Sequence, residues 1–187
     1  MNVEQIKKLV PELGDIHLFV GNTAAQAVLA SEKGLGIEAA QVCLCAAGAG
    51  WFQSDNGPVK GIQIDSLLPK RLSKEELRAV LLHEVGHIKC GHIASLEEAI
   101  AGRTLVGSFE ATEQEADMFS LEHGSDIVDL GNGIIKTLMC QLAQTAVAYK
   151  AIKGDEMSHA RKTRYLRSTA VSHKTRFRAF KALCNQF

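Results

Sequence analysis

The sequence has few prolines, and it has no low-complexity stretch and no internal repeat. Three prolines in 187 residues, with 46% hydrophobic and 22% charged residues, describe an ordinary globular chain and exclude a disordered or fibrous one. The length suits one domain with a real hydrophobic core. We predict a single domain over residues 1–187, with a sheet-rich part over 1–70 and a helical part over 71–187.

The chain also lacks the apolar segments that export or membrane insertion requires. Its first residues, MNVEQIKKLVPELGD, carry acids and lysines where a signal peptide needs an apolar core. The longest apolar run, residues 134–152, contains Lys136, Gln141, Gln144 and Lys150, which favours a buried helix over a membrane span. Five cysteines are scattered without paired CxxC spacing, a usage typical of a reducing compartment. These absences predict a soluble, cytoplasmic protein.

The net charge is zero but unevenly distributed. From Lys150 onward, ten Lys and Arg stand against two acids, which leaves eleven basic and nineteen acidic residues before that point. One interpretation is a solvated helix face that lies against the acidic surface of the same domain. The other is a contact for nucleic acid or an acidic partner, whose binding would depend steeply on salt.

Hydrophobic periodicity predicts strands first and helices afterwards, an α+β arrangement. We expect strands over 16–20, 41–46 and 59–65, and helices over 3–9, 24–31, 74–90, 112–123 and 126–153, with a last amphipathic helix through Phe177, Phe180, Leu183 and Phe187. The helix over 74–90 has the clearest start, because Ser73 and Glu76 form a capping-box pattern.

That helix contains most of the chemistry in the sequence. The stretch Leu81–His92, LLHEVGHIKCGH, holds three of the seven histidines. His83 and His87 are four residues apart, so both imidazoles lie on one helical face and can bind one metal ion, while Glu84 lies beside them as a general base for a metal-bound water. His92 falls out of register for a third ligand. We expect it either to contact a ligand residue without binding the metal itself or to lie at the helix end, where a histidine interacts favourably with the carbonyl dipole and supports the fold.

A catalytic zinc usually has three protein ligands, so the third must come from elsewhere. The second helix offers Glu113 and Asp117, again four residues apart. One carboxylate can bind zinc while the other accepts the free ring N–H of a ligand histidine, and the small Ala116 would allow the two helices to approach closely. Glu110 and Glu115 remain alternative ligands, and an ordinary acidic first turn is the alternative interpretation of the whole motif.

Together, LSKEELRAVLLHEVGHIKCGH and EQEADMFSLEHG resemble the HtpX and CAAX prenyl protease family of zinc metallopeptidases, over about residues 62–124. The resemblance implies a zincin-like α+β fold, one Zn²⁺ per chain held by His83, His87 and Glu113, and an orienting role for Asp117. The segment SHKTRFRAFKAL is similar to a later family element and nominates His173 as a residue that stabilises the transition state. Here Lys174 replaces the proline that usually follows.

The sequence also departs from that family. Many members carry transmembrane helices and a longer insertion, whereas 26 positions separate His87 from Glu113 here. This spacing is also reminiscent of thermolysin-like and ImmA-like gluzincins, and it indicates a compact soluble form. The resemblance further implies that an extended peptide adds to the edge of the strand over 59–65.

We therefore predict a zinc-dependent metalloendopeptidase that hydrolyses peptide bonds in a protein or peptide substrate through a zinc-bound water activated by Glu84. Two alternatives belong to other classes. One is a non-proteolytic zincin that binds a partner or senses metal. In the other, the basic C-terminal segment is a docking module for nucleic acid or an acidic partner.

Overall fold

The computed structural model describes residues 1–33, 44–103, 106–151, 174–178, 180–181 and 183–185. Its strands are β1 (His17–Gly21), β2 (Ala47–Ser54) and β3 (Gly57–Asp65). Its helices are α1 (Val3–Leu9), the 3-10 helix η1 (Pro11–Leu13), α2 (Thr23–Glu32), α4 (Leu68–Arg71), α5 (Lys74–Lys89), α6 (Leu96–Ile100), α7 (Phe109–Glu122) and α8 (Ile127–Ala151). Residues 174–178 are also helical. The α+β class is confirmed, whereas the single domain over 1–187 stays a prediction.

The three strands form one mixed sheet in the order β1-β3-β2. β1 runs parallel to β3, with Leu18 opposite Ile62, and β2 runs antiparallel to β3, with Ala49 opposite Ile62. β3 is therefore the central strand, and the prediction that residues 59–65 form a free edge is wrong. Among the described strands, β1 and β2 are the edges.

The prediction of a strand over 41–46 is also wrong for its described part. Residues 44–46 precede β2, which begins at Ala47 and contains the sequence AGAG. Glycine and alanine have low strand propensity, and this segment is held in the sheet by its backbone pairing with β3. Residues 41–43 lie outside the described part.

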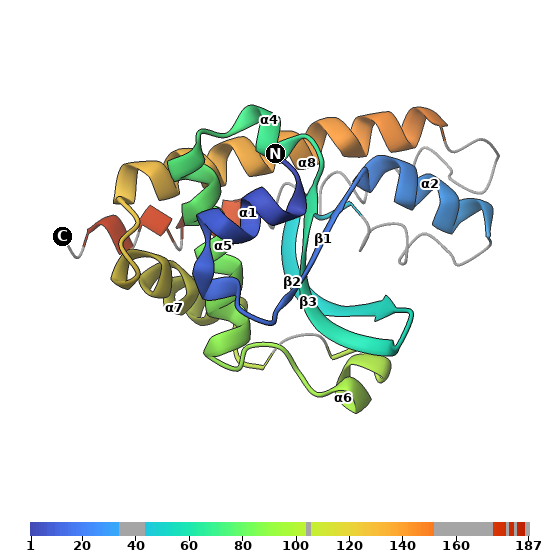
Figure 1. Ribbon diagram of the computed structural model, residues 1–187, viewed down its shortest axis with the longest axis horizontal. Helices are drawn as coiled ribbons and strands as arrows, with labels where there is room; N and C mark the ends of the chain where they lie inside the picture. The colour runs from blue at the N-terminus through green and yellow to red at the C-terminus, as the bar shows by residue number, and fades with distance from the viewer. Residues whose placement is uncertain (34–43, 104–105, 152–173, 179, 182, 186–187) are drawn as a thin grey trace.

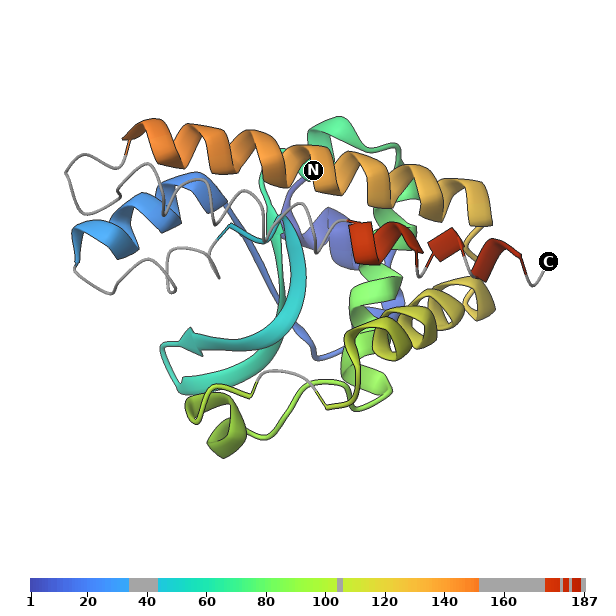
Figure 2. The same ribbon diagram turned by 180° about the vertical axis from the view of Figure 1, so that it is seen from behind.

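Helix α5 is the centre of the helical part and lies between the sheet and α7, with α8 running across them (Figures 1 and 2). Its start agrees with the sequence, because Ser73 and Glu76 cap it reciprocally. The apolar side chains of Leu77, Leu81 and Val85 are buried in one cluster with Ile62 and Ile64 of β3. Since burial of each such side chain contributes about 1.5–3 kcal/mol, this contact fixes α5 against the sheet.

A buried carboxylate joins segments that lie far apart in the sequence. Asp65, at the end of β3, is fully buried and accepts bonds from the Thr23 backbone N–H (3.0 Å) and hydroxyl (2.7 Å), from the Leu67 N–H (2.8 Å) and from Gln144 Nε2 (2.8 Å). Strand β3 is thereby tied to the start of α2 and the middle of α8.

The predicted helix over 112–123 begins three residues earlier than expected. Ser108 caps α7 through its hydroxyl, which accepts a bond from Ala111 N (3.4 Å), so the helix starts at Phe109. The Thr112 hydroxyl bonds back to the carbonyls of Ser108 and Phe109 instead of capping the helix. In the described part of the chain, no helix combines the length and the apolar character needed to cross a membrane.

Candidate metal centre

Two imidazoles on α5 face each other across one helical turn. His83 and His87 are buried, and their Nε2 atoms lie 3.1 Å apart. Their spacing of four residues produces this arrangement, as the sequence predicted. Both rings thus direct a nitrogen lone pair or N–H toward one point.

Helix α7 brings a carboxylate to the same point. Glu113 Oε1 lies 3.3 Å from His87 Nε2, and Glu113 Oε2 lies 3.5 Å from His83 Nε2. In a tetrahedral zinc site with bonds near 2.0–2.1 Å, ligand atoms are about 3.3–3.4 Å apart. The three separations, 3.1, 3.3 and 3.5 Å, lie close to that value. Two imidazoles with one carboxylate form a donor set that zinc accepts, so His83, His87 and Glu113 fit the metal.

Small residues allow the two helices to come this close. A Cβ placed on Gly86 would lie only 3.0 Å from Ala116 Cα and 3.0 Å from Phe119 Cβ. Ala116 is fully buried at the same crossing, in agreement with its predicted role. A larger side chain at either position would push Glu113 away from the two histidines.

Asp117, one turn after Glu113, holds the other nitrogen of His83. Its Oδ1 lies 2.8 Å from His83 Nδ1, and its side chain is fully buried. A carboxylate on Nδ1 keeps a proton on that nitrogen and leaves Nε2 free for a metal. This geometry is the one that the orienting role predicted for Asp117 requires.

Arg176 is the site residue that the sequence did not reveal. Its Nη1 and Nη2 donate to the two oxygens of Asp117 (2.8 and 2.5 Å), and its Nε lies 2.7 Å from Glu113 Oε2. The side chain is only 7% exposed. In the sequence Arg176 was one cation in a basic segment, and the segment SHKTRFRAFKAL that contains it was used only to nominate His173.

These contacts decide how the buried groups titrate. Burial alone would raise the pKa of the Glu113 and Asp117 carboxyls, but bonds and charges from histidine and from Arg176 hold both pKa values below their usual range. Burial and the Arg176 charge lower the pKa of His83, yet Asp117 and Glu113 outweigh them and raise it to about 10. In the metal-free protein His83 therefore binds a second proton, at Nε2, which an incoming metal ion must displace.

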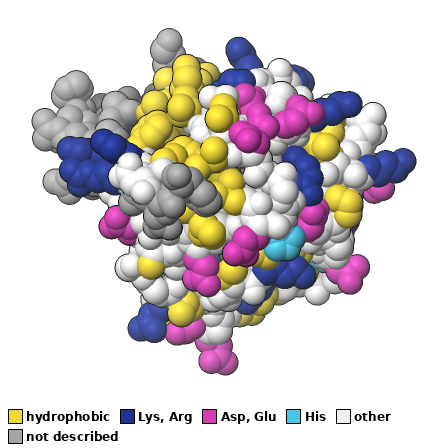
Figure 3. Space-filling view, turned by 90° about the vertical axis from the view of Figure 1, so that its left-hand side faces the viewer, with side chains coloured by type: hydrophobic (Ala, Val, Ile, Leu, Met, Phe, Trp, Pro, Cys, Tyr) yellow, Lys and Arg dark blue, Asp and Glu magenta, His cyan; other side chains and the backbone are white. Residues whose placement is uncertain are grey.

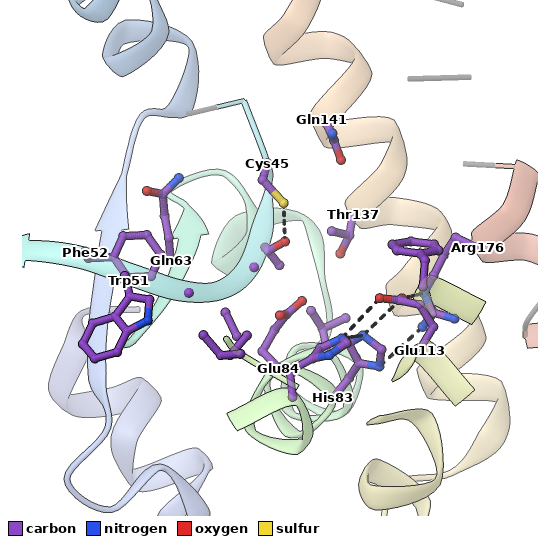
Figure 4. A pocket seen from close by; sticks show the side chains of 18 of the residues that line it. Cys45, Trp51, Phe52, Gln63, His83, Glu84, Glu113, Thr137, Gln141 and Arg176 are labelled. Carbon is purple, nitrogen blue, oxygen red and sulfur yellow. Dashed lines mark hydrogen bonds and ion pairs between the residues drawn. The ribbon is translucent and has the colours of Figure 1, made fainter. Parts of the chain in front are cut away.

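A cavity of about 760 Å³ opens over His83, His87 and Glu113. Figure 4 shows Glu84 pointing from α5 into this cavity, with β2 on one side and α8 on the other. The first half of β2 lines the cavity with small residues, Ala47, Gly48, Ala49 and Gly50. Most of the remaining wall is apolar: Trp51, Phe52, Val80, Ile93, Leu96, Ala99, Ile100, Phe109, Ile134 and Leu138. A chain segment with an apolar side chain therefore fits between β2 and α8.

The remaining predicted residues have separate positions. Glu110 is exposed at the start of α7, and Glu115 is 64% exposed with a bond to His92, so neither alternative ligand lies in the Glu113 cluster. His92 is buried beside His87. His173 lies outside the described residues, and its role stays a prediction.

The basic C-terminal segment is only partly described, because residues 152–173 lie outside the described part. On the face shown in Figure 3, the described Lys and Arg side chains are interspersed with Asp and Glu, and hydrophobic side chains gather toward the top of the view. These residues do not form a continuous basic surface there. The described part of this face gives no support to a nucleic-acid partner.

Comparison with known proteins agrees with the resemblance. No curated protein and no solved structure matches the chain. The model of peptidase family M48 matches residues 52–111, about a third of the chain, from β2 through α5 to the start of α7. The match includes His83, Glu84 and His87, ends two residues before Glu113, and indicates metallopeptidase activity. The resemblance to the HtpX and CAAX prenyl protease type of zinc metallopeptidase is therefore confirmed as a match to peptidase family M48.

Proposed function

We propose that the protein is a zinc-dependent metalloendopeptidase of zincin-like fold, with His83, His87 and Glu113 as the zinc ligands and Glu84 as the general base. The observation that carries this proposal is the position of Glu84. Its side chain points into the cavity beside the point where the three ligand atoms converge. A site that only bound metal would not require this carboxylate.

Zinc held there would supply a Lewis acid and an acidified water. Glu84 would take the proton from the attacking water and pass it to the leaving amine. Asp117 keeps the His83 ring in position through Nδ1, and Arg176 holds both Asp117 and Glu113. His173, nominated by the resemblance, would stabilise the oxyanion; His173→Gln should then lower kcat while zinc content stays unchanged.

The substrate would bind as an extended peptide along β2. Among the strands that the structure describes, β2 is an edge of the sheet, and it lines the cavity from Ala47 to Phe52, so its backbone can pair with an added strand. The small residues Gly48 and Gly50 allow close approach of that backbone. The apolar walls favour a substrate with a large apolar side chain next to the cleaved bond.

Glu84→Gln tests the mechanism. We expect zinc content near one per chain and a loss of peptide cleavage of about 10²–10⁴-fold, the range for loss of a general base. Glu75→Gln, an exposed acid on the same helix, is the matched control and should cleave like wild type. Equal cleavage by the Glu84→Gln variant and wild type would refute the mechanism.

Glu113→Gln tests the third ligand. The variant should lose zinc, whereas Glu110→Gln on the same helix should keep it. If Glu113→Gln retains zinc with wild-type affinity, the ligand assignment is wrong.

A further inference from the structure

The end of α5 folds back on the metal centre. Gly91 has a φ of +76°, in the left-handed region that glycine adopts without strain. The His92 N–H bonds to the His87 carbonyl (2.9 Å) and the Gly91 N–H to the Ile88 carbonyl (3.3 Å), the two bonds of a Schellman motif. This turn places the His92 ring beside the His87 ring, with centroids 5.1 Å apart.

The two rings are joined through their Nδ1 atoms. His87 Nδ1 lies 3.1 Å from His92 Nδ1, and His92 Nε2 lies 3.0 Å from Glu115 Oε2. His92 is 4% exposed, whereas the Glu115 side chain is 64% exposed. A chain of hydrogen bonds thus runs from His87 through a buried imidazole to a surface carboxylate.

The hydrogen positions along this chain follow from the ligand role of His87. A neutral imidazole that binds zinc through Nε2 carries its proton on Nδ1, so His87 Nδ1 donates. His92 Nδ1 must then accept, which leaves the His92 proton on Nε2, where it can donate to Glu115. Every nitrogen has a partner of the opposite kind.

We propose that His92 and Glu115 are positioning residues that fix the tautomer and the ring orientation of His87 for metal binding. The inference rests on the proposed function, since it takes His87 as a ligand. His92 would then accept the Nδ1 proton of His87, just as Asp117 accepts the Nδ1 proton of His83. Loss of such an orienting partner typically costs 10–100-fold in metal affinity or activity.

A second metal ion is the competing use of these residues. Cys90, His92 and Glu115 bring three metal-binding atoms within 4.8 Å of one another. A metal on His92 Nε2 would place the His92 proton on Nδ1, so that two N–H donors would face each other over the 3.1 Å between the rings. That contact is repulsive when His87 holds zinc. The geometry therefore favours the hydrogen-bond chain from His87 through His92 to Glu115 over a second metal ion.

The test compares His92→Leu, His92→Asn and Glu115→Ala with wild type in zinc affinity, kcat and KM, and in the visible spectrum of the cobalt-substituted protein. His92→Leu should weaken zinc binding by about 10–100-fold and change the cobalt spectrum. His92→Asn should recover most of the affinity, because its Oδ1 can accept the His87 N–H. Glu115→Ala should lose about tenfold, at the lower end of that range, with kcat affected more than KM.

Two controls separate the possible causes. Glu122→Gln removes an exposed acid from α7, the helix that carries Glu115, and should leave zinc affinity, kcat, KM and the cobalt spectrum unchanged. Cys90→Ser should also leave zinc affinity unchanged. If it weakens zinc binding as much as His92→Leu does, the positioning role of His92 and Glu115 is overturned in favour of a second metal site. Wild-type affinity and an unchanged spectrum in both His92→Leu and Glu115→Ala would also overturn it. A wild type that binds no zinc would overturn the proposed function, and this inference with it.

Discussion

Replacement of Arg176 by Met should destabilise the zinc-free protein far more than the loss of a surface ion pair. The guanidinium makes three contacts of 2.5–2.8 Å with Asp117 and Glu113. These side chains are 0% and 9% exposed, so water cannot replace the lost partner. Removal of one member of a buried ion pair costs about 3–5 kcal/mol. Because His83 still contacts Asp117, we expect a value near the lower end, about 3 kcal/mol.

The measurement is urea unfolding in the presence of a chelator, followed by the fluorescence of the single tryptophan, Trp51, and analysed by linear extrapolation. Arg103→Met is the matched control, because Arg103 pairs with Glu98 at 3.1 Å with side chains 70% and 41% exposed. Such a surface pair contributes about 0–1 kcal/mol. Arg176→Lys should fall between the two, since an ammonium cannot bind both carboxylates in the same fork. An equal decrease in the free energy of unfolding for Arg176→Met and Arg103→Met would refute the reasoning.

Three further predictions concern the framework of the site. Gly86→Ala should cost about 1–3 kcal/mol and weaken zinc binding, because the new Cβ meets Ala116; urea unfolding and metal titration measure the two effects. Asp65→Asn should cost about 1–3 kcal/mol in urea unfolding, since an amide N–H would face buried donors. Burial raises the pKa of Glu76, but bonds from Lys136 and Ser73 lower it overall. Because the folded-state pKa is lowered, the stability difference between wild type and Glu76→Gln should be full above about pH 5 and shrink as the pH falls below about 4, measured by unfolding at several pH values.

The parts of the site that the sequence predicted are those encoded by short spacing. His83 and His87 on α5, and Glu113 and Asp117 on α7, each lie four residues apart, and helical geometry alone puts each pair on one face. The capping box of Ser73 and Glu76 marked the start of α5 because it also depends only on residues close together in the sequence. Local patterns of this kind carry their own structural meaning.

The parts that were missed depend on contacts between distant segments. Arg176 lies 59 positions from Asp117, and no local pattern identifies it as buried. The central position of β3 depends on the pairing of β2, whose AGAG segment has no strand signal of its own. His92 was expected beside a ligand residue or at the helix end, and its bond to Glu115 could not be predicted because it depends on how α5 packs against α7.

The sequence separation of the Arg176 contacts predicts an order for assembly of the site. Helices α5 and α7 are close in sequence, so their contact closes only a short loop, and the two histidines and Glu113 can meet early in folding. Arg176 joins them by closing a longer loop from the C-terminal segment. Until that segment docks, Asp117 and Glu113 repel each other without the guanidinium between them. Zinc or a proton on His83 would have to compensate their charge in the meantime, so a metal ion present during folding should speed the formation of the α5–α7 pair.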